Sequence, residues 1–146
     1  MPTKDEIPEL PSTRKSDITD VIAILAARFS LDVDASIRQC EKESSFRTDV
    51  RNPVSDAYGL FQLEAPTAFQ MGVDRHDPAS NIYGGLKYMR WLKQVYKFTD
   101  RQAYAGYDWG GGNVHKLISE HPDDWESRLP TETREYVTFI CGEAGG

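Results

Sequence analysis

The most informative side chain of this sequence is a glutamate near the end of a predicted helix. Glu43 is followed by Ser44, Ser45 and Phe46, and a glycine-containing segment, Gly59-Leu60-Phe61-Gln62, follows it in the chain. A carboxyl group at a helix end can give a proton to a leaving oxygen, and backbone and amide groups of the second segment can hold a sugar beside it. The two segments together are what a glycosidase with a single acid needs.

An acid of this kind must keep its proton near neutral pH. The unpaired carbonyls at a helix C-terminus disfavour a carboxylate, and apolar neighbours such as Phe46 disfavour it further by desolvation. Both effects raise the pKa of Glu43. A shift from about 4.3 toward 6–7 needs roughly 3–4 kcal/mol, and helix-end effects give about 1 kcal/mol, so we expect burial in a cleft to supply the rest. A lone helical glutamate is usually a solvated surface residue, so the hypothesis depends on the companions of Glu43.

The composition limits the function classes. The 146 residues suffice for one domain with a real core. A net charge of −6 and a pI near 5.0 argue against a non-specific nucleic-acid binder, which needs a basic face. No apolar run approaches the roughly 18 residues of a membrane span, so we expect no membrane insertion. The N-terminal residues contain no apolar signal region, so we expect no export leader.

The chain divides into a short tail and a helical domain. Residues 1–15 contain three prolines among scattered charges and are predicted to be a flexible tail, and residues 16–146 form the domain. About seven short helices are expected, with a small strand or hairpin at Tyr58–Leu63. The predicted helix starts are Ser16, Asp34, Ser80 or Asn81, Thr99 (a capping box with Gln102), Val114 and Pro130-Thr131. Pro66 suits the first turn of a further short helix that stops at Gly72, and the other predicted helix ends are Ser44 and Gly142.

Several ordered motifs support a family resemblance over roughly residues 17–141. The chain resembles the soluble lytic transglycosylase (SLT domain) family, which is related in fold to goose-type lysozymes. The resemblance implies a mainly α, lysozyme-like single domain with a very small β or hairpin element. The motifs that carry it are Glu43-Ser44-Ser45-Phe46, Ser55 to Leu63 followed by Pro66-Thr67-Ala68, Asp77-Pro78 with Asn81-Ile82 and Gly85, Ala105 to Gly110, and Leu129 to Val137.

The resemblance also implies a reaction. Glu43 would protonate the oxygen between N-acetylmuramic acid and N-acetylglucosamine in peptidoglycan, and the acetamido group of the substrate would shelter the cationic centre. Glu43 would then deprotonate the 6-hydroxyl of the same sugar, which gives a 1,6-anhydro product without a cofactor or a metal. Ser44 would orient Glu43. The substrate-binding residues would be Gly59, Leu60, Gln62, Tyr107, Trp109, Gly110 and Tyr136.

Two departures from the family pattern leave hydrolysis open as the alternative. Asp108 and the bulky Trp109 stand where the family usually has Asn and a small residue, and Glu64 stands where transglycosylases commonly have Met. Asp108 or Glu64 could act as a second carboxylate that activates water, which would turn the reaction into lysozyme-type inverting hydrolysis. Each is also readily explained as a solvated acid. A third alternative is a wall-binding or virion structural module without turnover, against which the retained Glu43 argues.

The histidines and cysteines indicate no further chemistry. His76, His115 and His121 lack metal-ligand spacing. Cys40 and Cys141 are interpreted as two small buried hydrophobic residues, although a bridge between them stays open. A peptidase pair of Cys40 with His115 has no local support.

The expected partner is the glycan strand of peptidoglycan, with no nucleic acid. An acidic wall-cleaving protein without a leader suggests a bacteriophage wall lysin, made in the cytoplasm and carried by the virion or released at lysis. A secretion-system accessory enzyme is the alternative. In either setting, residues 1–15 could attach the domain to a virion or a secretion assembly.

Overall fold

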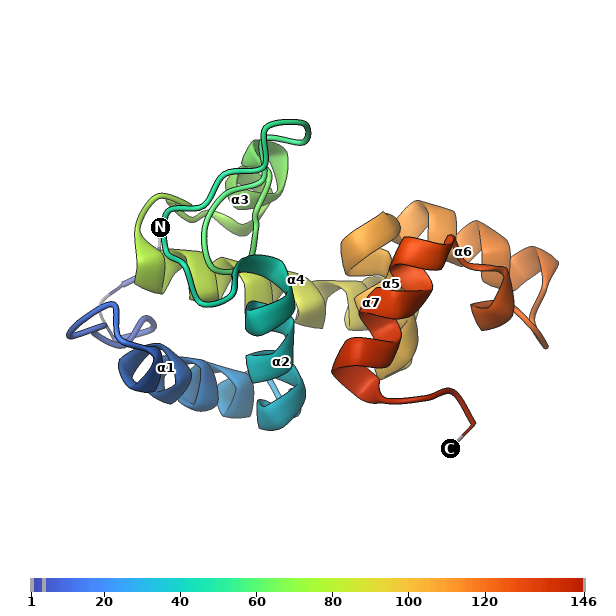
Figure 1. Ribbon diagram of the computed structural model, residues 1–146, viewed down its shortest axis with the longest axis horizontal. Helices are drawn as coiled ribbons and strands as arrows, with labels where there is room; N and C mark the ends of the chain where they lie inside the picture. The colour runs from blue at the N-terminus through green and yellow to red at the C-terminus, as the bar shows by residue number, and fades with distance from the viewer. Residues whose placement is uncertain (1, 4, 146) are drawn as a thin grey trace. The chain divides into compact units, whose positions relative to one another are not determined.

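The computed structural model describes residues 2–3 and 5–145, and these are mainly helical (Figure 1). Within these residues, strand pairing is limited to two isolated antiparallel bridges, Arg51 with Tyr58 and Tyr58 with Leu63. The predicted mainly α fold with a very small hairpin element is therefore confirmed. The helices are α1 (Lys15–Arg28), α2 (Val33–Ser44), α3 (Ala65–Met71), α4 (Pro78–Tyr96), α5 (Asp100–Trp109), α6 (Gly111–Glu120), the 3₁₀ helix η1 (Glu126–Arg128) and α7 (Thr131–Cys141).

The residues form two compact units, one up to Tyr88 and one from Met89 onward. The first unit holds α1, α2, α3 and the first part of α4, and α1 packs against α2 in it. In the second unit α5 packs against both α6 and α7. Fully buried apolar side chains fill each unit: Ile18, Ile22, Leu25, Leu60, Phe61, Leu63, Ile82 and Leu86 in the first, and Leu92, Ala103, Val114, Val137 and Ile140 in the second.

The predicted cap of the first helix was wrong. α1 begins at Lys15, without a side-chain cap on its N-terminus, so Ser16 lies inside the helix. The hydroxyl of Ser12 accepts a hydrogen bond from the Arg14 amide and donates one to the Asp17 carboxylate. Ser12 therefore bridges the approach to the helix and its first turn, and this allows the helix to start earlier than Ser16.

The predicted cap of the second helix was also wrong, by two residues. α1 ends with Ser30 in the left-handed region (φ 58°), and the Leu31 amide bonds back to the Ala26 carbonyl at 2.9 Å, which is a Schellman ending. This ending allows α2 to begin only a few residues later. The carboxylate of Asp32 accepts from the Ala35 amide at 2.8 Å, so Asp32 takes the cap that was assigned to Asp34. The predicted end of this helix at Ser44 is confirmed.

The longest helix, α4, begins at Pro78 and not at Ser80 or Asn81. The carboxylate of Asp77 accepts from the amide and the hydroxyl of Ser80, at 3.0 and 2.7 Å, and so satisfies the first turn. Asn81 therefore lies inside the helix and does not cap it. Further along, a side chain at Gly85 would meet Phe61 at 2.6 Å, so the glycine lets the loop before α3 pack directly on α4.

In the second unit the helix signals were mostly correct. The capping box of Thr99 and Gln102 is present at the start of α5, and α7 begins at Thr131 and stops at Gly142 as predicted. α6, however, begins at Gly111 and not at Val114. A Cβ at Gly111 would lie 2.5 Å from the Tyr96 ring, so this glycine is needed for the packing of the first turn of α6.

The described part of residues 1–14 contains no helix or strand, and some of it contacts helices of the first unit. Arg28 donates to the Glu6 carbonyl at 2.9 Å, and the Tyr83 hydroxyl bonds to the Glu6 carboxylate at 3.1 Å. These contacts join the segment to α1 and α4. The flexibility expected for residues 1–15 stays a prediction.

Candidate active site

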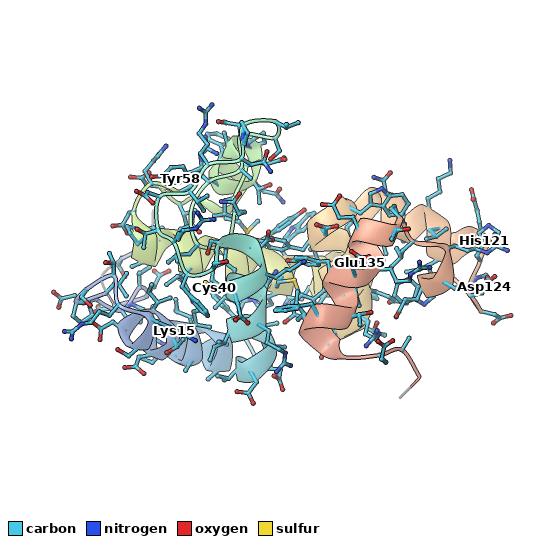
Figure 2. All side chains as sticks on the ribbon, viewed as in Figure 1. Lys15, Cys40, Tyr58, His121, Asp124 and Glu135 are labelled. Atoms are coloured by element: carbon cyan, nitrogen blue, oxygen red, sulfur yellow. The ribbon has the colours of Figure 1, made fainter. Side chains whose placement is uncertain are left out.

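The candidate acid lies in the last turn of α2. Glu43 is half-buried, and the next residue, Ser44, is buried. The Ser44 hydroxyl donates to the Cys40 carbonyl at 3.1 Å and lies 3.9 Å from the Cys40 sulfur. Cys40 is labelled on α2 in Figure 2. The hydroxyl is thus directed at the helix backbone, and its role in orienting Glu43 stays a prediction, as does the raised pKa of Glu43.

The backbone turns sharply directly after Glu43 and Ser44. Ser45 (φ 53°) and Phe46 (φ 62°) are consecutive non-glycine residues in the left-handed region. Each such residue costs about 1–2 kcal/mol, so the surrounding contacts must hold the turn in place. One of these contacts is the ammonium of Lys15, which lies 4.9 Å from the centre of the Phe46 ring. Strained backbone of this kind is common at functional sites.

The side chain of Gln62 holds the second predicted element, the Gly59–Gln62 loop, by hydrogen bonds to backbone carbonyls. The Gln62 amide nitrogen donates to the Val50 carbonyl at 2.9 Å and to the Gly59 carbonyl at 3.0 Å. Both amide hydrogens are used, so the group of this side chain that can meet a ligand is the oxygen Oε1, an acceptor. A hydroxyl or an acetamido N–H of a sugar fits that chemistry. Gln62 is half-buried and adopts φ 49°.

Asn81 holds the same loop from α4, and sequence reasoning missed this role. The Asn81 oxygen accepts from the Phe61 amide at 2.8 Å, and its nitrogen donates to the carbonyls of Tyr58 at 2.8 Å and Arg75 at 2.9 Å. Asn81 was considered only as a possible helix start. The signal was its place in the motif with Asp77-Pro78, but its partners lie 20 and 23 residues away in the loop and no local rule finds them.

A charged cluster closes the ends of this loop. The Arg75 guanidinium donates to the Asp56 carbonyl, to the Leu63 carbonyl at 3.0 Å and to the Asp56 carboxylate at 2.9 Å. Arg51 donates to the other carboxylate oxygen of Asp56. The hydrogen bonds from Arg75, and then from Arg51, hold the pKa of the Asp56 carboxyl below its usual value. Asp56 therefore fixes the ends of the loop.

The other predicted ligand-binding residues lie in the second unit. Tyr107 and Trp109 are half-buried near the end of α5, Asp108 between them is exposed, and Gly110 (φ 102°) joins α5 to α6. The Trp109 carbonyl accepts from the Asn113 side chain at 2.7 Å, which fixes the joint. Tyr136 on α7 is only 3% exposed.

The predicted residues are divided between the two compact units. Glu43 and Ser44, together with the loop residues Gly59, Leu60 and Gln62, belong to the first unit, and the residues of α5 to α7 belong to the second. The candidate second carboxylate Glu64 is exposed at the N-cap position of α3 and makes no side-chain cap bond there. Its role, like that of Asp108, stays a prediction.

Other side chains that could do chemistry are inert or scattered in the described residues. Burial raises the pKa of the Cys40 thiol to about 12, so the thiol stays protonated. Cys40 is buried and Cys141 is half-buried, and the two do not form a disulfide. No three His, Cys, Asp or Glu residues among those described are placed to hold one metal ion. None of the helices described is both long and apolar enough to cross a membrane.

A comparison with models of known protein families identifies the family of this chain. The family model "Transglycosylase SLT domain" matches residues 24–128, which is more than half of the chain. The chain belongs to the SLT domain family. The match includes the α2 end, the Gly59–Gln62 loop and the joint between α5 and α6.

Two curated relatives share the name "Membrane-bound lytic murein transglycosylase F". The chain is 30% identical over 135 residues to the protein from Cellvibrio japonicus (strain Ueda107), and 29% identical over 123 residues to that from Pasteurella multocida (strain Pm70). The matches cover 84% and 72% of this chain, but 26% and 25% of the relatives. The chain thus spans about a quarter of the length of these curated relatives.

Solved structures of SLT proteins have the same fold. Lytic transglycosylase Slt from Pseudomonas aeruginosa, solved as an inactive mutant with glutamine in place of a glutamate, has a TM-score of 0.71 at 24% identity. The 70 kDa soluble lytic transglycosylase from Escherichia coli has a TM-score of 0.71 at 21% identity. The matches cover 82% and 83% of this chain and 22% of each solved chain. The predicted lysozyme-like fold of the SLT type is therefore confirmed.

Proposed function

We propose that this chain cleaves the glycosidic bond between N-acetylmuramic acid and N-acetylglucosamine in peptidoglycan, with Glu43 as its acid. The observation that carries the proposal is the position of Glu43 in a chain of the SLT family. It is half-buried in the last turn of α2, and the two consecutive left-handed residues Ser45 and Phe46 begin two positions after it. The names of the curated relatives support the same activity. So does the inactive state of the Pseudomonas aeruginosa protein with glutamine in place of a glutamate.

In the proposed reaction Glu43 acts twice. Its carboxyl gives a proton to the bridging oxygen, and the bond from that oxygen to the anomeric carbon of the muramic acid breaks. The acetamido oxygen of the same sugar stabilises the positive charge on that carbon. The Glu43 carboxylate then takes the proton of the 6-hydroxyl, and the 6-oxygen closes on the anomeric carbon. The enzyme returns to its first state, the product is a 1,6-anhydro sugar, and no water is consumed.

The first unit supplies groups that suit the binding of N-acetylated sugars. Both hydrogens of the Gln62 amide already bond to carbonyls, so its oxygen Oε1 is the group that can accept a hydrogen bond from a ligand. This oxygen belongs to the same loop as the backbone groups of Gly59 and Leu60. In the proposal these groups bind the glycan. Tyr107, Trp109 and Gly110 would contact further sugars, and Tyr136 would support them from its buried position in α7.

The test compares two glutamates of the same helix. Glu43→Gln should lower the rate of clearing of purified cell walls by about 10²-fold or more, because general acids contribute about 10²–10⁴-fold. Glu41 is exposed and two positions earlier, so it points to another side of α2 and Glu41→Gln is the matched control. Clearing by Glu43→Gln at the parent rate would remove Glu43 as the acid. A parent protein that binds walls without clearing them would support the non-catalytic module.

Mass spectrometry of the released fragments separates the two catalytic alternatives. The proposal expects 1,6-anhydro ends, and reducing ends would instead identify a hydrolase. In that case Glu64→Gln and Asp108→Asn would show which carboxylate activates water.

Delivery to the wall by a bacteriophage, or by a secretion assembly that holds residues 1–15, is a further part of the proposal. Detection of the protein in purified virions would test the first route.

A further inference from the structure

The buried asparagine of α4 has an unusual set of partners. Asn81 is the fourth residue of the helix and 1% exposed, and its carboxamide makes three hydrogen bonds outside the helix. It accepts from the Phe61 amide and donates to the carbonyls of Tyr58 and Arg75, all within 2.9 Å. Both amide hydrogens are thus used, and the oxygen is paired. A buried carboxamide with fixed partners on a loop fixes the position of that loop.

Gly59 has no side chain and so leaves space for the carboxamide of Asn81. A Cβ placed on Gly59 would lie 2.4 Å from the Asn81 nitrogen and 2.9 Å from its Cγ, and the residue has φ 83°. Asn81 therefore lies directly against the backbone of Gly59. The Gln62 amide meets the same residue at its carbonyl oxygen, at 3.0 Å. Two carboxamides thus hold the backbone of the residue that begins the candidate glycan-binding segment.

The third bond of Asn81 extends the network to the ends of the loop. It is accepted by the carbonyl of Arg75, whose guanidinium bonds to the carbonyls of Asp56 and Leu63. The Arg75 side chain is only 12% exposed, so these bonds are largely shielded from water. Asn81 therefore acts on the loop directly, at Tyr58 and Phe61, and also through Arg75.

We propose that Asn81 is a positioning residue that holds the Gly59–Gln62 loop in its glycan-binding geometry; the glycan part rests on the proposed function. A loop without regular secondary structure must be ordered before its groups can bind, and ordering it during binding weakens affinity. Asn81 removes that cost in advance. Because the loop would bind sugar while Glu43 transfers the proton, loss of Asn81 should weaken binding much more than it slows the chemical step.

Local hydrogen exchange tests the positioning without reference to activity. In Asn81→Ala the Phe61 amide loses its acceptor, so its exchange should become at least about tenfold faster relative to the core amides of α1. Asn81→Asp is the second variant, in case the alanine variant does not fold. It keeps the shape and the acceptor but loses at least one donated bond, so the loop amides should exchange faster than in the parent. Ser80→Ala, the neighbouring residue on the same helix, is the control and should leave the loop amides unchanged.

Steady-state kinetics on soluble peptidoglycan fragments test the link to binding. For the folded fraction of Asn81→Ala or Asn81→Asp, we expect KM to rise about tenfold or more and kcat to stay within about twofold, since small displacements of binding groups have effects of this size. Ser80→Ala should retain the parent values. A merely structural role would lower activity only in proportion to the unfolded fraction, with KM unchanged, and that result would overturn the link to binding.

The two readouts keep this inference separate from the proposed function. If the parent protein neither cleaves fragments nor binds an N-acetylglucosamine tetramer, the proposed function fails, and hydrogen exchange still decides whether Asn81 positions the loop. If the parent is active and the folded variants match it in both loop exchange and KM, the positioning role is wrong while the proposed function stands.

Discussion

Replacement of Gly59 by alanine is the sharpest test of the contact between the loop and α4. The structure offers a matched control in Gly72, which ends α3. Both glycines are left-handed, with φ 83° and 71°. A Cβ at Gly72 would meet nothing within 4 Å, whereas one at Gly59 would lie 2.4 Å from the Asn81 nitrogen. The two substitutions therefore share the backbone effect and differ in the collision.

The expected magnitudes follow from these two effects. A side chain in the left-handed region costs about 1–2 kcal/mol, and the lower chain entropy of unfolded alanine offsets about 0.5–1 kcal/mol of it, so Gly72→Ala should lose about 1 kcal/mol. In Gly59→Ala, Asn81 must also move, which breaks buried hydrogen bonds worth about 1–3 kcal/mol each when a partner is left unsatisfied. We therefore expect a total loss of about 3–5 kcal/mol for Gly59→Ala.

Urea denaturation followed by circular dichroism measures both losses. A second measurement identifies the cause: in an Asn81→Ala background the obstructing side chain is gone, so Gly59→Ala should then cost only about 1 kcal/mol more. Equal losses for Gly59→Ala and Gly72→Ala in the parent background would refute the close contact. Additive losses in the double variant would assign the cost of Gly59→Ala to something other than Asn81.

Three further predictions concern other parts of the structure. Ser45→Gly should stabilise the protein by about 0.5–1 kcal/mol, because glycine adopts φ 53° without strain, and thermal denaturation measures it. Folding lowers the pKa of Asp56 below its unfolded value near 3.9. The contribution of Asp56 to stability is therefore present above that unfolded pKa and is lost as the pH falls through the lower pKa of the folded state. Asp56→Asn should therefore flatten the loss of stability between about pH 5 and pH 2, and an unchanged slope would contradict it. At pH 8 iodoacetamide should label Cys141 while Cys40, with its pKa of about 12, stays protected until unfolding, which peptide mass spectrometry detects.

The helices could be predicted well where their signals are local. The capping box at Thr99, the glycine stop at Gly72 and the end of α2 at Ser44 each depend on residues within one turn, and all three are confirmed. The error at the start of α2 arose where two local signals competed. Asp32 and Asp34 are equally good caps by type, and only the way α1 ends at Ser30 decides between them.

The candidate site was harder to predict because its loop is held by distant residues. The motifs identified the Gly59–Gln62 segment, but contacts that hold it come from Asn81 and Arg75, 12 to 23 residues further along the chain. Polar contacts of this kind have no sequence period, in contrast to an apolar helix face. The same limit applies to Gly111, which lies before the predicted helix start at Val114 and is required because the Tyr96 ring packs against it.

Strain in the described backbone is concentrated next to the proposed acid and the loop. Of the six non-glycine residues with positive φ among those described, four lie between positions 45 and 62: Ser45, Phe46, Asp56 and Gln62. Such conformations persist only where neighbouring contacts over-determine them. In the loop these contacts are hydrogen bonds from Gln62, Arg75 and Asn81, and at Phe46 the Lys15 ammonium lies over the ring. A single substitution in this network should therefore release the loop while the helices remain folded.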